Sequence, residues 1–401
     1  MTKDKHNIIS TFRPAVLIAG PAWGSVLGFI RSLGRHKIPV YVIAPAPSFK
    51  FYAASKYCTA AFELKGPNVS EGFLDWLKRW QEEQTFNCKP IYFPVTDSAC
   101  TYFSECKEDL NRFDLCIPAK GIILNMIDKS RANRCATENG LDVPPFKYVK
   151  DLNSFNTAMS SIPYPCIVKP VWWKNRGEVG FKTRICSNFK ELEATGYELL
   201  NKNSFFLVQQ YIKGSDSDVY TYMFYRTRDG KNIYGCTGRK IRQMPPNQGI
   251  MASGMAEDNP RLKEISDNFI RKIDYRGFGG IEFKKQGEKY CFIEMSVRPE
   301  GFSPLATEAG IDLSWIGYCD MVGISPGNLS NLKQNKAYWL AGLEYIHLIK
   351  YSKKPFKYLL EAIFLSMQRH VRFSVWSTSD PMPWFKVLLY TFFKKIGITN
   401  R

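Results

Sequence analysis

A strand–helix–strand pattern near the N-terminus constrains the fold more than any other feature of the sequence. Two short apolar runs, AVLIAG (Ala15–Gly20) and IPVYVIA (Ile38–Ala44), flank a stretch whose apolar residues recur at helical spacing. Runs that are apolar throughout are typical of strands buried on both faces of a parallel sheet. The run PIYFPVTD (Pro90–Asp97) continues the pattern, with helices expected over 70–86 and 98–112. We therefore predict an α/β chain whose first, Rossmann-like domain ends near residue 120.

The turn between the first strand and the first helix reads GPAWGS and lacks the G-x-G-x-x-G spacing of a dinucleotide site. In that motif the glycines admit a pyrophosphate, and an acidic residue after the second strand binds the ribose. No such acid follows Ile38–Ala44. A structural turn is therefore favoured over a dinucleotide site.

A second α/β unit follows the first. Residues 127–146 predict a helix with Asp128 near its start and its end at Gly140, where the following prolines force an extended chain. Two apolar strands come next, YPCIVKPV with Lys169 and SFFLVQQYIKG, separated by a glycine-containing loop. Four alternating segments then predict an antiparallel sheet: DVYTYMFYR, NIYGCTGRKIR, GGIEFKK and YCFIEMS.

Two acidic residues lie in the last two of these segments. The short turn QGEK predicts a hairpin that places Glu282 beside Glu294. Neighbouring carboxylates repel unless a cation lies between them, and oxygen ligands suit Mg²⁺ that bridges phosphates. Alternation also puts Glu294, Ser296 and Arg298 on one face. The alternative is a solvated edge strand that carries a surface ion pair.

Basic residues suggest an anionic ligand for the same region. Lys169 lies within the apolar strand CIVKP, where an ammonium group is costly to bury unless an anion neutralises it. Lys129 follows Asp128 at the helix start and would usually be solvated. The loop after Lys169 can fold backbone N–H groups over phosphates, although it is not a Walker A sequence.

The order of these motifs resembles the ATP-grasp superfamily over roughly residues 15–325. The motifs are DK, the lysine strand, the glycine-containing loop, VQQYIKG, GGIEF and FIEMSVRPEG. Within it, SLGRHKIPVYVI, FPVTDS, TGRKIRQMPP and EAGIDLSWIGY are similar to the carboxylate–amine ligases of the D-aspartate ligase-like group. The resemblance implies domains at 1–120 (pre-ATP-grasp), 121–330 (ATP-grasp) and 331–401 (a basic, aromatic-rich, helical C-terminal segment).

The resemblance also implies ATP and Mg²⁺, with Mn²⁺ as an alternative, and a role for each matching residue. The residues expected to hold the nucleotide are Lys129, Lys169, Gly177, Gly180, Gln209, Gln210, Tyr211, Ile212, Asp216 and Asp218. Glu282, Glu294 and Ser296 would hold the metal. Arg298 and Lys169 would act on the transferring phosphate. The implied reaction forms an amide through an acylphosphate on an amino acid, a peptidoglycan precursor or an envelope glycan.

Two positions depart from the family pattern. Ser296 stands where the family normally has Asn, and Gln209-Gln210 stands where many relatives have an acid. A regulatory or catalytically poor ATP-binding protein therefore stays open as an alternative. The basic turn GRKIRQMPPNQG is a candidate contact for an acidic substrate through Arg239, Lys240 or Arg242, or else a solvated hairpin.

The C-terminal segment is basic, with ten Lys/Arg against three Asp/Glu from Leu340 onward, interleaved with aromatic residues. It predicts amphipathic helices that either cap the core or contact an anionic membrane.

Composition limits the remaining classes of function. A net charge of +18 favours anionic partners, but neither a zinc-finger nor an RNP motif supports nucleic acid. The eleven scattered cysteines suit a reducing compartment, and the polar N-terminus predicts no signal peptide. We expect a cytoplasmic protein, with the inner membrane face as the site of any membrane contact. None of the four histidines lies between the DK and FIEMSVRPEG motifs, which disfavours a Cys–His or Ser–His hydrolase.

Overall fold

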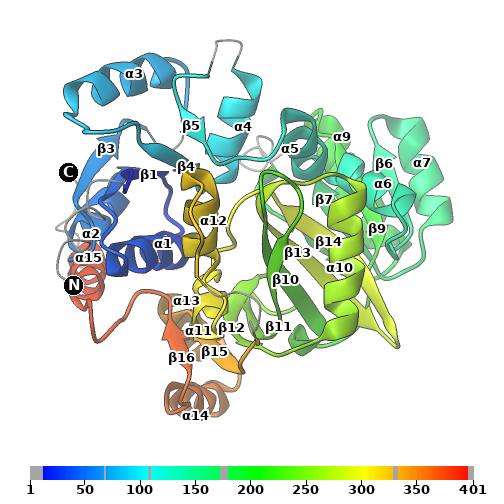
Figure 1. The fold of residues 1–401 in the computed structure, drawn as a ribbon. Coiled ribbons are helices and arrows are strands. Elements are labelled where there is room, and N and C mark those ends of the chain that lie inside the picture. The colour runs from blue at the N-terminus through cyan, green and yellow to red at the C-terminus, as the bar shows by residue number, and fades with distance from the viewer. Residues whose placement is uncertain (1–11, 67–68, 107–109, 172–178, 328–332, 396–401) are drawn as a thin grey trace.

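The computed structural model describes residues 12–66, 69–106, 110–171, 179–327 and 333–395. Within these residues the strands form a five-stranded, a four-stranded and a seven-stranded sheet. Figure 1 shows the five-stranded N-terminal sheet at one end of the molecule and the four-stranded sheet at the other, with the seven-stranded sheet between them.

The N-terminal sheet is parallel, in the order β3-β2-β1-β4-β5, which confirms the predicted Rossmann-like start. Its strands are β1 (Ala15–Ile18), β2 (Val40–Pro45), β3 (Ala60–Leu64), β4 (Ile91–Pro94) and β5 (Asp114–Leu115). Its helices are α1 (Trp23–Arg35), α2 (Ser48–Ala53), α3 (Phe73–Glu83) and α4 (Asp97–Glu105). Every residue of β1 is buried, as a strand covered by helices on both faces requires.

Helices α5 (Lys120–Ile127) and α6 (Lys129–Glu138) lead out of this sheet. The Asp128 carboxylate caps α6 by accepting hydrogen bonds from the N–H groups of Ser130 at 2.9 Å and Arg131 at 3.1 Å. Gly140 follows with a φ of +87°, a value that favours glycine. The predicted start at Asp128 is therefore correct, and the helix ends two residues before the predicted glycine.

The four-stranded sheet is antiparallel, in the order β6-β9-β7-β8. It consists of β6 (Phe146–Val149), β7 (Cys166–Pro170), β8 (Arg184–Cys186) and β9 (Phe206–Gln210), covered by α7 (Leu152–Ser161) and α9 (Phe189–Asn201). The two helices meet at Gly196, where an added Cβ would lie 1.9 Å from the Phe155 ring. Only glycine allows this close approach.

The seven-stranded sheet has the order β14-β13-β10-β11-β12-β15-β16. Four of its strands confirm the predicted antiparallel region: β10 (Val219–Arg226), β11 (Ile233–Met244), β13 (Gly277–Gln286) and β14 (Lys289–Ser296). A fifth strand, β12 (Ile250–Ala256), was not predicted and pairs antiparallel with β11. The associated helices are the short 3₁₀ helix η2 (Asp216–Asp218), α10 (Pro260–Lys272), α11 (Pro304–Glu308) and α12 (Leu313–Val322).

The C-terminal segment is not helical throughout, because it supplies the last two strands of the seven-stranded sheet. These are β15 (Ala337–Leu340), which pairs with β12, and β16 (Val371–Phe373), which pairs with β15. Its helices are α13 (Gly342–Tyr351), α14 (Pro355–Ser366) and α15 (Met382–Lys395). In the described part of the chain no helix is both long enough and apolar enough to cross a bilayer.

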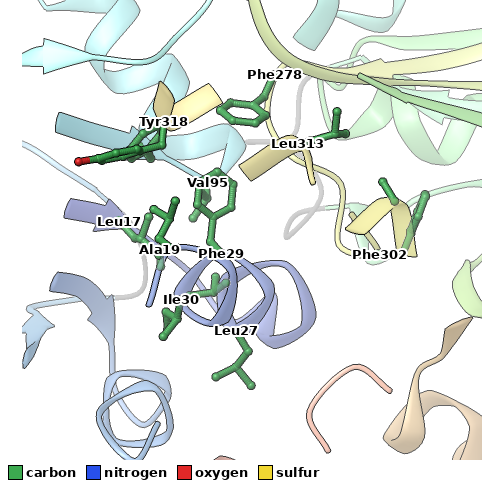
Figure 2. Close-up of a cluster of buried hydrophobic side chains, with 14 of the residues drawn as sticks. Leu17, Ala19, Leu27, Phe29, Ile30, Val95, Phe278, Phe302, Leu313 and Tyr318 are labelled. Atoms are coloured by element: carbon green, nitrogen blue, oxygen red, sulfur yellow. The ribbon is translucent and has the colours of Figure 1, made fainter. Parts of the chain in front are cut away.

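A shared hydrophobic core joins the N-terminal sheet to the seven-stranded sheet (Figure 2). Phe29 of α1 contacts Phe278 of β13 with ring centroids 5.3 Å apart, and Tyr318 of α12 belongs to the same cluster. Contacts of aromatic rings at this distance bury large apolar areas. They hold the start of α1 in place beside the end of β14.

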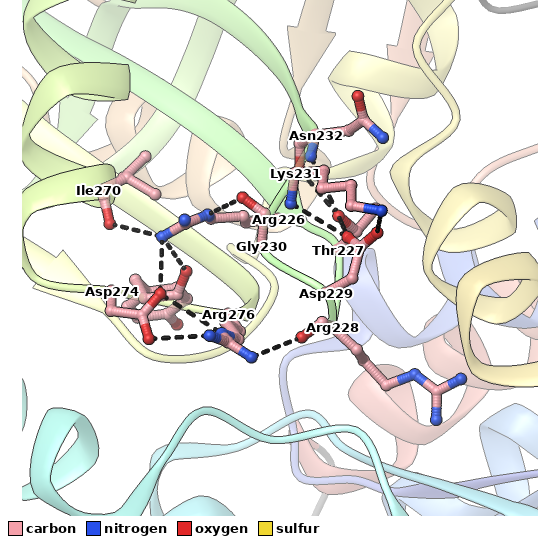
Figure 3. A network of polar contacts seen from close by, with 11 residues as sticks. Arg226, Thr227, Arg228, Asp229, Gly230, Lys231, Asn232, Ile270, Asp274 and Arg276 are labelled. Carbon is pink, nitrogen blue, oxygen red and sulfur yellow. Dashed lines mark hydrogen bonds and ion pairs between the residues drawn. The ribbon is translucent and has the colours of Figure 1, made fainter.

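A polar network fixes the same end of β10 and β13, because Arg226 follows Tyr225, the register partner of Phe278 (Figure 3). The guanidinium of Arg226 on β10 donates to the carbonyl oxygens of Gly230, Ile270 and Tyr275 at 3.0, 3.1 and 3.2 Å. Asp274 adds an ion pair at 3.3 Å. The network therefore ties the β10–β11 turn to the C-terminal end of α10.

Candidate functional site

Two cavities lie between the sheets. The first, of about 100 Å³, is enclosed by β7 and β9 of the four-stranded sheet and by β11, β13 and β14 of the seven-stranded sheet. The second, of about 400 Å³, extends from β14 to the start of α1 and to the C-terminal segment. Residues that line both cavities are Lys182, Lys240, Gly249, Glu282 and Glu294. The cavities therefore meet at two carboxylates and two ammonium groups.

The two carboxylates face each other directly. Glu282 of β13 is the register partner of Glu294 of β14, so the predicted hairpin places them side by side. Glu282 is buried and accepts a hydrogen bond from the ammonium of Lys240 at 2.8 Å. The Lys182 ammonium, 3.8 Å from Glu294, holds the pKa of that carboxyl well below its ordinary value. Both groups are therefore suited to act as anionic oxygen ligands for a divalent cation.

Lys169 reaches the first cavity from β7 and is buried. Its ammonium donates to the side-chain oxygen of Gln209 at 2.8 Å, and the amide nitrogen of Gln209 donates to Asn133 at 2.8 Å. Burial lowers the pKa of Lys169 to about 8. The side chain of Gln209 therefore orients Lys169. The alternation of residues along the strands does not predict this contact.

The segment after β9 lines the same cavity through Gln210, Tyr211 and Ile212. The N–H of Gln210 donates to Pro145 and that of Tyr211 to Pro165, each at 2.9 Å. Within the described residues, no protein acceptor is recorded for the N–H of Ile212. This N–H is therefore free to bind a ligand in the cavity.

Asp216 and Asp218, two of the residues expected to hold the nucleotide, line neither cavity. The Asp216 carboxylate is buried and accepts from the N–H groups of Gln243 and Asn247 at 2.9 and 2.8 Å. Asp218 accepts from the N–H of Ser215 at 2.6 Å. The side chains that line the cavity in this region belong to Gln243, Asn247 and Lys284. Sequence spacing did not single out these three.

The three basic candidates of the turn GRKIRQMPPNQG separate in the structure. Lys240 lines both cavities, whereas Arg239 pairs with Glu257 at 3.1 Å and lines neither. Arg242 pairs with Glu361 of α14 at 3.0 Å, beyond a register shift in the β11–β12 ladder. The structure therefore brings only Lys240 of this group to the cavities that it describes.

The segment after β14 lines the second cavity. Its wall includes Ser296, Arg298 and Glu300. The sequence predicts this for Ser296 and Arg298, because alternation puts both on the same face of the strand as Glu294. Arg298 pairs with Asp97 at the start of α4 at 3.2 Å and with Glu300 at 3.6 Å. Its guanidinium is thus held between the N-terminal sheet and the hairpin. Burial raises the pKa of Glu300.

Lys129 lines the first cavity at the start of α6. Gly180 has a φ of +76°, in the region that favours glycine. Gly177 lies outside the described residues. Lys182, which lines both cavities, was not singled out from the sequence because it follows the loop rather than lying in a buried strand.

Comparison with known proteins identifies the central part of the chain. The ATP-grasp domain profile matches residues 134–303. Formate-dependent phosphoribosylglycinamide formyltransferase of Wolinella succinogenes is 27% identical over 193 residues, which cover 45% of this chain and 46% of that enzyme. D-alanine–D-alanine ligase of Aquifex aeolicus is 24% identical over 209 residues, 46% of this chain and 65% of the ligase.

Among solved structures, the biotin carboxylase domain of Hydrogenobacter thermophilus 2-oxoglutarate carboxylase, in complex with MgADP, ADP and bicarbonate, has a TM-score of 0.63. Its identity is 18%, and the match covers 82% of this chain and 73% of the carboxylase domain. The fold is therefore α/β with an ATP-grasp core behind a Rossmann-like N-terminal sheet, as the sequence predicts. The chain carries an ATP-grasp domain over residues 134–303 and has homologues in the ATP-grasp superfamily, and it spans less than two thirds of the length of these two relatives, the formyltransferase and the ligase.

Proposed function

We propose that the protein is an ATP-dependent carboxylate–amine ligase that forms an amide bond through an acylphosphate. The observation that carries this proposal is the junction of the two cavities at Glu282, Glu294, Lys182 and Lys240. A nucleotide in the first cavity would present its terminal phosphate to a substrate in the second. ATP-grasp relatives that include D-alanine–D-alanine ligase support the same class of reaction.

The first cavity would hold ATP. Lys129 and Lys169, which line this cavity, would hold the phosphates, and the N–H of Ile212 would bind the adenine. The paired carboxylates Glu282 and Glu294 fit Mg²⁺ or Mn²⁺ by donor chemistry, with the Ser296 hydroxyl as a further oxygen. A metal ion held there neutralises phosphate charge and so lowers the barrier to phosphoryl transfer.

The reaction itself needs no protein nucleophile. A substrate carboxylate oxygen attacks the γ-phosphorus, the bond to ADP breaks, and an acylphosphate forms. The neutral amine then forms a bond to the acyl carbon, the bond from that carbon to the phosphate oxygen breaks, and the nitrogen gives up one proton to the departing phosphate. Lys182, Lys240 and Arg298 surround this position and neutralise its charge. Asp97 and Glu300 hold the Arg298 guanidinium in one orientation, which reduces the entropy lost in the transition state.

Trapping with hydroxylamine tests the proposal without knowledge of the amine. MgATP, hydroxylamine and pooled carboxylic acids are expected to yield ADP together with a hydroxamate, and mass spectrometry of the hydroxamate names the acid. ATP binding without any hydroxamate would instead support a regulatory ATP-binding protein. That second candidate is favoured by Ser296 and by the ion pair in which Lys240 already neutralises Glu282.

Affinity for MgATP is expected to fall as the pH rises above about 8, because phosphates bind the ammonium form of Lys169 and its pKa is about 8. Below that pH the lysine is already protonated, so the affinity is flat. Above it each further pH unit lowers the protonated fraction of the free protein, and with it the affinity, by about tenfold, until the raised pKa of the bound state is reached. Titration calorimetry between about pH 7 and 9.5 measures the effect.

The control for this pH profile is Lys169→Arg, whose guanidinium stays protonated over the whole range. Its affinity for MgATP is expected to be lower but independent of pH. A wild-type dissociation constant for MgATP that stays the same between about pH 7 and 9.5 would contradict the role of Lys169.

Membership of the D-aspartate ligase-like group, and domain limits at residues 120 and 330, remain proposals that rest on the motifs of the sequence. The acid would be a small molecule or a glycan carboxylate. The residues with proposed roles are those that line the two cavities, so Asp216, Asp218, Arg239 and Arg242 are proposed instead to stabilise the fold.

We also propose that the C-terminal helices contact an anionic membrane surface. Of the 20 large apolar side chains that are exposed in the described chain, 14 lie between Ile346 and Phe393. Phe356, Phe364 and Met367 are among the most exposed, at 70%, 64% and 78%. Basic residues are interleaved with them, which provides charge complementarity to anionic lipid.

Replacing Phe356, Phe364 and Met367 together by serine is expected to weaken binding to phosphatidylglycerol vesicles by about tenfold or more, because each buried apolar side chain contributes ~1 kcal/mol or more. Co-sedimentation measures the binding. The matched control is Leu152→Ser with Phe189→Ser, two exposed apolar side chains outside the C-terminal segment. Equal binding by wild type and the triple variant would exclude this surface as the membrane contact.

A further inference from the structure

The wall of the second cavity has a charged part and an apolar part. Lys182 and Lys240 line the charged part with the paired carboxylates and Arg298, whereas the part contributed by the start of α1 and by Trp339, Ala341 and Leu343 is apolar. The indole of Trp23 is fixed there by a hydrogen bond to the Ser48 hydroxyl at 3.2 Å and by an edge contact with Phe51. Phe302 and Leu343 line the same cavity. A ligand that fills the cavity would therefore have a polar end and an apolar body.

Four acidic side chains line this cavity, and three of them face a cation. Glu282 pairs with Lys240 at 2.8 Å, Glu294 with Lys182 at 3.8 Å, and Glu300 with Arg298 at 3.6 Å. The fourth, Glu344, forms no ion pair in the part of the chain that the structure describes. The titratable side chain next to it on the helix is His347, one turn further along α13.

Glu344 lies in the first turn of α13, where the positive end of the helix dipole favours an ionised carboxylate. Burial acts in the opposite direction and raises the pKa of Glu344. A carboxylate that is partly removed from water and lacks a cation gains stability when a ligand supplies one.

We infer that the second cavity binds the amine-bearing substrate, with Glu344 as the partner of an ammonium group and the Trp23 end as the surface for an apolar or ring-shaped body. This inference rests on the proposed function, because it divides the two substrates of the ligase between the two ends of one cavity. The acid occupies the cationic end, beside Lys182, Lys240 and Arg298. The substrate class is thus a primary amine carried on a body with an apolar face.

Benzylamine and benzyl alcohol are suitable probes, because they share a ring and differ in charge. Titrations followed by ligand-observed NMR would compare wild type, Glu344→Gln and the control Glu264→Gln, which removes an exposed carboxylate of α10. Loss of a charged hydrogen bond is expected to raise the benzylamine dissociation constant about tenfold in Glu344→Gln. Affinity for benzyl alcohol should change less than about twofold, and Glu264→Gln should resemble wild type.

Equal weakening of both probes, no change with benzylamine, or no benzylamine binding by wild type would each overturn the inference. The hydroxylamine experiment separates it from the proposed function. Hydroxamate formation by wild type tests the ligase without the amine site, because hydroxylamine is small and uncharged at neutral pH. A wild type that binds benzylamine through Glu344 but forms no hydroxamate would retain the amine site and refute the ligase.

Discussion

Hydroxamate formation is expected to fall at least about a thousandfold when Glu282 and Glu294 are both replaced by alanine. The two carboxylates are register partners on β13 and β14 and lie where the cavities meet. Their removal leaves the lysines to repel one another and takes away the oxygen ligands of the proposed metal site. Release of ADP and hydroxamate, measured with an acid that wild type activates, gives the magnitude.

The double alanine variant also leaves Lys240 buried without its carboxylate, and this alone destabilises a protein. Glu282→Gln with Glu294→Gln is therefore the second variant, because the amides keep the volume and can accept a hydrogen bond from the ammonium. Glu288→Ala is the control, since that side chain is 84% exposed in the turn of the same hairpin. Activity within tenfold of wild type in a folded double glutamine variant would refute the proposed metal site.

Replacing Asp380 by alanine is expected to lower the free energy of unfolding by about 3–5 kcal/mol, the range for breaking a buried ion pair. The side chains of Asp380 and Arg31 are each 1% exposed and pair at 2.9 Å. Asp380 also accepts from the Ser55 hydroxyl at 2.7 Å and the N–H of Lys56 at 3.0 Å. The substitution would leave the Arg31 guanidinium buried without its counter-ion.

Urea unfolding followed by fluorescence measures this loss. The control is Asp75→Ala, because the Asp75 side chain is 67% exposed and its pair with Lys78 spans 3.5 Å, so the expected change is below about 1 kcal/mol. Because Asp380 fastens the C-terminal segment to α1 and α2, α15 is expected to become more sensitive to proteolysis in the variant. A loss no larger than that of Asp75→Ala would show that the segment does not depend on this ion pair.

Local pattern was sufficient for much of the fold. The parallel N-terminal sheet follows from its apolar strands, and the start of α6 follows from the capping Asp128. Alternation and a short turn predicted the hairpin that brings Glu282 beside Glu294. The two-residue connection alone would pair Glu282 with Ile293, and a register shift between Glu282 and Phe283 places Glu294 opposite instead. These features depend on residues that are near one another in the chain, so the sequence predicts them without knowledge of the remaining structure.

Tertiary packing decided which polar side chains reach the cavities. Lys240 and Arg242 lie two residues apart, yet a register shift in β11–β12 sends the first to Glu282 and the second to Glu361. The Asp216 carboxylate accepts hydrogen bonds from the backbone N–H groups of Gln243 in β11 and Asn247 in the following loop, and it therefore does not line the cavity.

Glu344 provides the clearest contrast between sequence and tertiary structure. It lies 50 residues after Glu294 in the chain. Both residues line the second cavity, because β15 pairs with β12 of the seven-stranded sheet and so directs the start of α13 toward this cavity. The sequence by itself determined the strands, the hairpin of paired acids and the ATP-grasp order of motifs. Only the tertiary structure decided the lining of the second cavity, because that lining depends on contacts between segments far apart in the chain.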